Sequence, residues 1–144
     1  MFCNINNWGH PLWCIIHIIS YLMDMNSNNV DKMIIFLDRL QYIIPCQYCQ
    51  NHYVKNINEY LKINGKWNTK ILHNKKILIY SLIIIHQSIN INNNKNNHSV
   101  HYYYNFWEKK KNKKTLLKKY INNLRLCENI NEEIYNNINN IQIN

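Results

Sequence analysis

The chain has 144 residues, 47% of them hydrophobic, and a formal net charge of +9. This length fits one domain with a tail, and the apolar content is sufficient for a hydrophobic core. Asn, Ile and Lys dominate and Ala is absent, which is typical of A/T-rich codons. We therefore interpret the positive charge as codon bias on a solvated surface, not as a nucleic-acid-binding patch.

No leader and no membrane-spanning segment are expected. Met1 to Asn7 is polar, unlike a charged leader that precedes an apolar run. Two apolar runs, Pro11 to Met23 and Ile77 to Ile85, are shorter than the about 20 residues that cross a bilayer. These features predict a soluble or peripheral protein.

Apolar residues at helical spacing predict four long helices. Their expected ranges are Trp8 to Met23, Asn29 to Ile43, Cys46 to Leu61 and Thr69 to Ile91. Pro11 falls in the first turn of the first range, where proline is tolerated, and Pro45 ends the second helix. Asn64-Gly65 is expected to break the chain after the third helix. Strands are an alternative for short apolar runs, but the lengths of these runs favour helices.

The remainder of the chain has a weaker pattern. Asn92 to Asn97 is expected to form a loop, Tyr102 to Trp107 a short aromatic segment, and Lys109 to Lys114 a solvated charged linker. From Thr115 onward, apolar residues keep helical spacing among weakly polar neighbours, which predicts one or two marginal helices. We therefore divide the chain into a domain at 1–107 and a tail at 108–144.

A single Cys-x-x-Cys motif carries the clearest chemical information. Cys46 and Cys49 follow Pro45 at the expected start of a helix. Unpaired backbone N–H groups and the positive end of the helix dipole lower the pKa of the first thiol there and favour its nucleophilic thiolate. The five cysteines are an odd number, unlike a fully paired secreted framework. The pair therefore indicates redox or metal chemistry.

Three kinds of protein carry such a motif. A structural zinc site needs two further ligands, and no second Cys-x-x-Cys or His-x-x-x-His pair occurs, although Cys3, Cys14 and the seven histidines could assemble one in space. A thioredoxin fold needs alternating strands and a proline downstream of the motif, where this chain has none. A Cys-x-x-Cys in an all-helical domain points instead to a bound flavin as the electron acceptor. No metal ligands are predicted.

Three motifs in a fixed order carry a resemblance to a known family. The first motif is Trp8-Gly9, Trp13 and His17, followed by Tyr21. The second motif is Pro45, Cys46, Cys49, His52 and Tyr53. The third motif is His86-Gln87-Ser88-Ile89-Asn90, with Lys95 behind it. In this order and spacing the chain resembles the Erv/ALR family of FAD-linked sulfhydryl oxidases, especially its short viral members of the poxvirus thiol-oxidase type.

The resemblance covers roughly Trp8 to Lys95 and departs from the family pattern in places. Gln87 stands where the family usually has Asn, and Ser81 stands where a Trp is frequent. Both departures concern contacts with the adenine end of FAD. The structural disulfide that often ties the end of the cellular domain is not evident, which fits a minimal viral form.

The resemblance implies an all-α fold, with a four-helix bundle around FAD, a short fifth helix and a helical C-terminal tail, assembled as a homodimer. It implies a thiol oxidase that passes electrons from a protein dithiol to the Cys-x-x-Cys, to FAD and to oxygen, which leaves as hydrogen peroxide. A glutaredoxin- or thioredoxin-like carrier is one implied substrate. The implied pathway is viral disulfide formation in the host cytoplasm or virion, or the mitochondrial intermembrane space for a cellular protein.

The resemblance also assigns residue roles. Cys49 would lie beside the flavin, and Cys46 would exchange with the reduced substrate. The other implied FAD contacts are Trp8, Gly9, Trp13, His17, Tyr21, His52, Tyr53, His86, Asn90 and Lys95.

The remaining cysteines have no assigned chemistry. Cys14 lies among isoleucines and is expected to be a buried free thiol. Cys3 and Cys127 lie outside the matched range and could pair with each other, across a dimer, or not at all. We expect no essential role for them. Two other functions remain open, a zinc-stabilised helical interaction module and a basic nucleic-acid-binding protein.

Overall fold

The computed structural model describes residues 3–60, 62–63, 66–67, 72–93, 95 and 97–144, and the predicted all-helical class is confirmed there. A short antiparallel pair, β1 (Lys62–Ile63) and β2 (Lys66–Trp67), follows the third helix. The helices are α1 (Ile5–Leu22), α2 (Ser27–Ile43), α3 (Gln47–Tyr60), α5 (Lys75–Asn92), α6 (Val100–Glu108), α7 (Lys113–Arg125) and α8 (Glu132–Asn140). Three predicted features lie outside the described residues, namely the end of the third helix at Leu61, the break at Asn64-Gly65 and the start of the fourth helix at Thr69.

Asparagine side chains cap several helix starts. The Asn4 side chain accepts a hydrogen bond from the backbone N–H of Asn6, and Asn26 accepts one from Asn29. Such caps satisfy N–H groups that the first turn leaves unpaired. Because of these caps, α1 and α2 begin earlier than the sequence predicted. Pro11 consequently lies inside α1 and not in its first turn, and its nitrogen cannot donate to the carbonyl four residues earlier.

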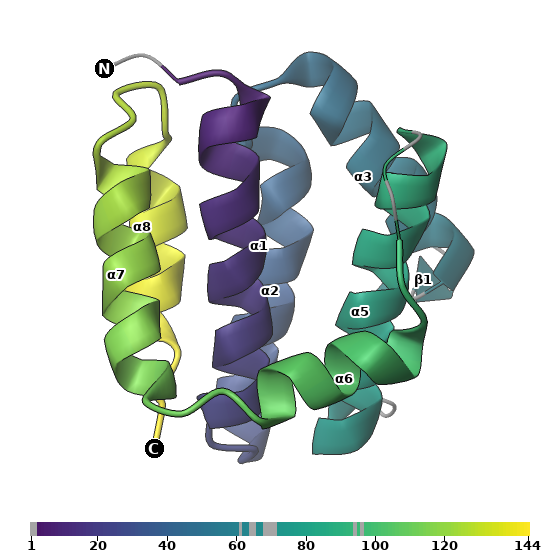
Figure 1. The fold of residues 1–144 in the computed structure, drawn as a ribbon, viewed down its shortest axis with the longest axis vertical. Helices are drawn as coiled ribbons and strands as arrows, with labels where there is room; N and C mark the ends of the chain where they lie inside the picture. The colour runs from purple at the N-terminus through teal and green to yellow at the C-terminus, as the bar shows by residue number, and fades with distance from the viewer. Residues whose placement is uncertain (1–2, 61, 64–65, 68–71, 94, 96) are drawn as a thin grey trace.

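Helix α1 lies near the centre of the fold (Figure 1). It packs against α7 on one side and against α5 and α6 on the other, while α2 packs against α3 and α8. Ile15 and Ile18 of α1 and Phe36 of α2 are completely buried. The hydrophobic core therefore surrounds α1 and α2, and α1 separates the C-terminal helices from α5.

The C-terminal helices belong to this core, contrary to the expectation that they would be marginal. Leu124 of α7 and Ile134 of α8 are completely buried in the same hydrophobic cluster as α1 and α2. The expected solvated linker is also shorter than predicted, because Lys113 already begins α7. The division into a domain at 1–107 and a tail at 108–144 stays a prediction, but residues of both segments share one hydrophobic core.

A disulfide between Cys3 and Cys127 ties the start of the chain to the segment between α7 and α8. This pairing is one of the three alternatives that the sequence left open for these two cysteines. Asn129 strengthens the junction, since its side chain accepts from the backbone N–H of Cys3 at 3.0 Å and donates to the Cys3 carbonyl at 2.8 Å. The N-terminal end of α1 is therefore fixed to the tail by covalent and polar bonds.

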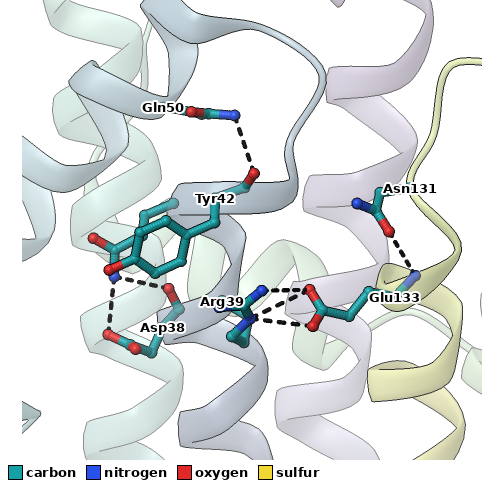
Figure 2. A network of polar contacts seen from close by, with 7 residues as sticks. Asp38, Arg39, Tyr42, Gln50, Asn131 and Glu133 are labelled. Atoms are coloured by element: carbon teal, nitrogen blue, oxygen red, sulfur yellow. Dashed lines mark hydrogen bonds and ion pairs between the residues drawn. The ribbon is translucent and has the colours of Figure 1, made fainter.

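Polar contacts join α2 to its neighbours (Figure 2). The Arg39 guanidinium donates to both carboxylate oxygens of Glu133 in α8, with the shortest distance at 3.1 Å. The Gln50 side chain in α3 donates to the carbonyl oxygens of Tyr42 and Ile44. The two Gln50 bonds join the start of α3, where the cysteine pair lies, to the end of α2. In the described part of the chain, no helix has the length and apolar character needed to cross a membrane.

Candidate functional site

Cys46 and Cys49 form a disulfide at the start of α3, with their Cα atoms 5.1 Å apart. Cys46 is the residue immediately before the helix, and its carbonyl accepts the backbone N–H of Gln50 at 2.9 Å. Its sulfur accepts the backbone N–H of Cys49 at 3.2 Å. The Cys46 sulfur thus accepts a backbone N–H at the start of the helix, whereas its predicted lowered thiol pKa stays a prediction. When the disulfide opens, this N–H stabilises negative charge on Cys46.

A cavity of about 420 Å³ lies among α1, α5 and α6. Small-molecule sites are typically about 300–1,000 Å³. Six residues that the sequence predicted as cofactor contacts line it, although they come from positions far apart in the chain. They are Gly9, Trp13, His17, His86, Asn90 and Lys95.

A second cavity, of about 80 Å³, adjoins the first and reaches the cysteine pair. Ile5, Gly9, Trp13, Ile89 and Asn93 line both cavities, so the two share a wall. The predicted site residues that line the smaller cavity are Trp8, Gly9, Trp13, Cys49, His52 and Tyr53. The inner cysteine is therefore positioned against the cavity system.

Two predicted site residues lie outside both cavities. One is Cys46, which agrees with the outward role that the resemblance implies for it. The other is Tyr21, whose hydroxyl donates to the carbonyl of Tyr104 at 2.8 Å, while the Lys113 amine lies 5.5 Å from the centre of its ring. Tyr21 thus packs between α6 and α7, away from the cavity lining.

Four rings form a stack in the wall of the larger cavity. Trp13 lies nearly parallel to His86, with ring centres 4.3 Å apart and planes at 5°. His17 stacks on His86 at 5.1 Å and on Trp107 at 5.7 Å. Parallel rings from α1, α5 and α6 form a surface suited to a flat aromatic ligand.

The two histidines of this stack are held neutral. Burial lowers the pKa of His17 to about 3. Burial also lowers the pKa of His86 well below its usual value, and electrostatic interactions with His17, Lys95 and His10 lower it further. The His17 Nε2 and His86 Nδ1 atoms lie 2.9 Å apart, so one ring donates and the other accepts. Neutral rings can stack on an aromatic ligand without a charge losing its hydration.

The charged groups around the larger cavity are cationic. Lys95 lines it, and its described lining contains no Asp or Glu. The Lys110 amine lies 4.4 Å from the centre of the Phe106 ring, which also lines the cavity. This distribution favours an anionic ligand.

His52 has an unsatisfied polar atom beside the cysteine pair. Its Nδ1 is buried and has no hydrogen-bond partner among the described residues. The ring lines the smaller cavity with Cys49, and the Tyr48 ring lies 4.2 Å from it. Buried nitrogens in folded proteins are almost always hydrogen-bonded. An additional polar partner in this cavity would satisfy His52.

Gly9 lies at the boundary of the two cavities. A Cβ atom added there would meet a single neighbouring atom, the Cγ1 of Ile5 at 3.4 Å. Glycine inside a helix costs about 0.5–1 kcal/mol relative to alanine. Because Gly9 has no side chain, the space at the boundary of the two cavities stays open.

Some residues of the lining were not predicted. The most prominent are on α6, where Tyr103, Phe106 and Trp107 line the larger cavity. Their spacing of three and four residues places them on one face of a helix, and this pattern is visible in the aromatic segment of the sequence. His10 and Asn93 also line the cavity without having been predicted.

Cys14 carries a buried free thiol, and this prediction is confirmed. It lines the larger cavity, and its sulfur lies 3.6 Å from the Nε2 of His10. Burial raises the pKa of the Cys14 thiol to about 11, so it stays protonated at neutral pH and is a poor nucleophile. Within the described residues, no group of three or more His, Cys, Asp or Glu side chains is placed to hold a metal ion.

Comparison with known proteins gave no match, since no family model, no curated protein and no solved structure matches the chain. The resemblance to the Erv/ALR family therefore rests on the three motifs, and its functional content is a proposal.

Proposed function

We propose that this protein is an FAD-dependent thiol oxidase of the Erv/ALR type. The observation that carries the proposal is the position of the cysteine pair. Cys49 lines a cavity that shares its wall with a larger, aromatic and cationic one, whereas Cys46 lies outside both. This arrangement provides an inner sulfur for an electron acceptor and an outer sulfur for a substrate.

The chemistry of the lining fits FAD. A flat isoalloxazine or adenine ring would stack on neutral aromatic side chains, and a diphosphate would be attracted by Lys95 in a lining without carboxylates. Trp8, His52 and Tyr53 would hold the flavin end beside Cys49. His86, Asn90 and Lys95 would hold the nucleotide end. When bound, FAD supplies the two-electron acceptor that the thiols lack and passes the electrons to oxygen.

The chain's own residues perform the exchange with the substrate. A substrate thiolate attacks the Cys46 sulfur, which breaks the Cys46–Cys49 bond, forms a mixed disulfide and releases Cys49 as a thiolate. The second substrate thiol then displaces Cys46, giving an oxidised substrate disulfide and a reduced cysteine pair. The Cys49 N–H stabilises the departing Cys46 thiolate, because it already donates to that sulfur. The electrons of the pair end on oxygen as hydrogen peroxide.

The wider biological assignment is part of the same proposal. Helices α1, α2, α3 and α5 would form the four-helix bundle around FAD, and α6 the short fifth helix. The substrate would be a protein dithiol, such as a glutaredoxin- or thioredoxin-like carrier, in a viral pathway of disulfide formation. We also propose a homodimer.

Oxygen consumption with dithiothreitol tests the proposal. The protein reconstituted with FAD should consume oxygen and release hydrogen peroxide. Cys46→Ser and Cys49→Ser should each abolish turnover while both variants retain FAD and the Cys3–Cys127 disulfide, which controls for folding. Near-normal turnover in either variant would refute the mechanism. A stoichiometric zinc ion or co-purifying nucleic acid, with no flavin uptake, would favour one of the other two functions instead.

A further inference from the structure

The further inference concerns how a reduced substrate reaches Cys46, and it rests on the proposed thiol-oxidase function. Because Cys49 lines the smaller cavity and Cys46 does not, a substrate thiol approaches from the outer side of the pair. Tyr48 lies between Cys46 and Cys49 in the sequence and is exposed, so it is positioned to contact whatever carries that thiol.

Two large apolar side chains at this mouth are exposed. Tyr48 lies between the two cysteines and is 62% exposed, and Ile5 at the start of α1 is 43% exposed. Both line the smaller cavity, so the cavity opens at the surface between the starts of α1 and α3. The centres of the Tyr48 and His52 rings lie 4.2 Å apart. This contact limits the conformations that the Tyr48 side chain can adopt before a partner binds. We call these two residues the Ile5–Tyr48 rim.

Charged side chains are absent around Tyr48 in the sequence and from the lining of the smaller cavity, although the chain as a whole is highly charged and Ile5 also lines the larger cavity with Lys95. The sequence contains 17 Lys and Arg residues and 8 Asp and Glu residues, yet none of them falls between residues 40 and 54. The lining of the smaller cavity also contains none of these four residue types. A charged segment docked here would lose hydration without gaining an ionic partner. An apolar segment would bury area on both sides of the contact.

We propose that the Ile5–Tyr48 rim is the substrate-docking surface, and that it binds an uncharged, apolar polypeptide segment carrying the thiols to be oxidised. Exposed aromatic side chains that are already ordered are common anchors of such contacts. No lysine or arginine falls between residues 40 and 54 or in the lining of the smaller cavity, so the net charge of +9 does not select the substrate at this surface.

The test uses the FAD-loaded full chain and three synthetic peptides with the same cysteine pair, flanked by leucine, glutamate or lysine. The measured quantity is kcat/KM for each peptide divided by kcat/KM for dithiothreitol. We expect the leucine peptide to exceed both charged peptides by about tenfold, equivalent to about 1.4 kcal/mol. Raising the salt from about 0.1 M to about 1 M shortens the Debye length from about 10 Å to about 3 Å and should leave this rate nearly unchanged.

Three variants assign the effect to the rim. Tyr48→Ala should lower the ratio for the leucine peptide by about tenfold, and Tyr48→Phe should restore it because the ring is retained. Tyr102→Ala removes an exposed tyrosine on α6 that lines neither cavity and should leave the ratio unchanged.

Several results would overturn the inference. One is a preference for the glutamate peptide that disappears at high salt, since the positive charge would then select the substrate. Another is an equal loss of peptide and dithiothreitol turnover in Tyr48→Ala, which would give Tyr48 a role in the exchange itself. An enzyme that oxidises dithiothreitol without peptide preference would refute only the docking surface. No oxidation of any thiol would refute the proposed function as well.

Discussion

Replacing Gly9 tests whether the two cavities form one ligand site. The perturbation is Gly9→Leu, which keeps the helix and places a side chain where a Cβ would meet only Ile5. Without ligand, the variant should be more stable than the natural chain by about 0.5–1 kcal/mol, because leucine is the better helix former. With FAD present, the variant should instead be less stable than the natural chain. The leucine side chain occupies space at the boundary of the two cavities and therefore weakens FAD binding.

The size of the reversal follows from overpacking. An extra side chain in a filled site typically costs about 1–3 kcal/mol. A loss in the upper part of this range, about 2.7 kcal/mol, corresponds to about 100-fold weaker FAD binding. At an FAD concentration about 100 times the natural dissociation constant, the ligand stabilises the natural fold by about 2.7 kcal/mol. In the variant, that stabilisation should fall to about 0.4 kcal/mol.

The assay is urea unfolding with and without FAD. Asn7→Leu is the matched control, because it places the same side chain on an exposed position of α1 that lines neither cavity. The control should keep the full FAD-dependent stabilisation. If Gly9→Leu also keeps it, Gly9 does not border the ligand and the two cavities do not form one FAD site.

Three further predictions concern stability. His17 is neutral in the folded state with a pKa of about 3 but titrates near 6.5 when unfolded, so its contribution is complete above about pH 6.5. Stability should fall by about 1.4 kcal/mol per pH unit as the pH drops toward 3, and urea unfolding of His17→Gln should lack that component. Replacing both Cys3 and Cys127 with alanine opens a link between residues 124 positions apart and should lower the free energy of unfolding by about 2–5 kcal/mol; an unchanged urea midpoint would contradict a structural role. Arg39→Met should cost less than about 1 kcal/mol, because the Arg39 and Glu133 side chains are 42% and 38% exposed, and a much larger loss would show that the pair is more than a solvated contact.

The helices could be predicted because apolar residues such as Ile15 and Ile19 recur at helical spacing and are buried in the structure. Their starts were less predictable. Asn4 and Asn26 act as caps, but asparagine is so frequent in this sequence that no single one stands out as a cap. The cysteine pair was recognisable because its spacing, and the proline before it, are local features of the chain.

The spacing of apolar residues in the C-terminal tail could not predict which helices the tail packs against. Leu124 and Ile134 repeat at helical intervals, yet this pattern does not say which helix they cover. The pairing of Cys3 with Cys127 is likewise a tertiary property, since it depends on how α1 and α7 lie side by side. The α6 side chains of the cavity, including Trp107, were missed because no chemistry singles out an aromatic face from ordinary core packing.

The visible absorption spectrum of Cys46→Ser after incubation with FAD tests the central claim most directly. In this variant the unpaired Cys49 thiolate is expected to lie against the flavin, so the spectrum should show flavin absorption together with a long-wavelength charge-transfer band. Cys49→Ser should show the flavin absorption without that band. A band in Cys49→Ser alone would reverse the roles of the two cysteines. Folded protein that binds no FAD would contradict the account as a whole.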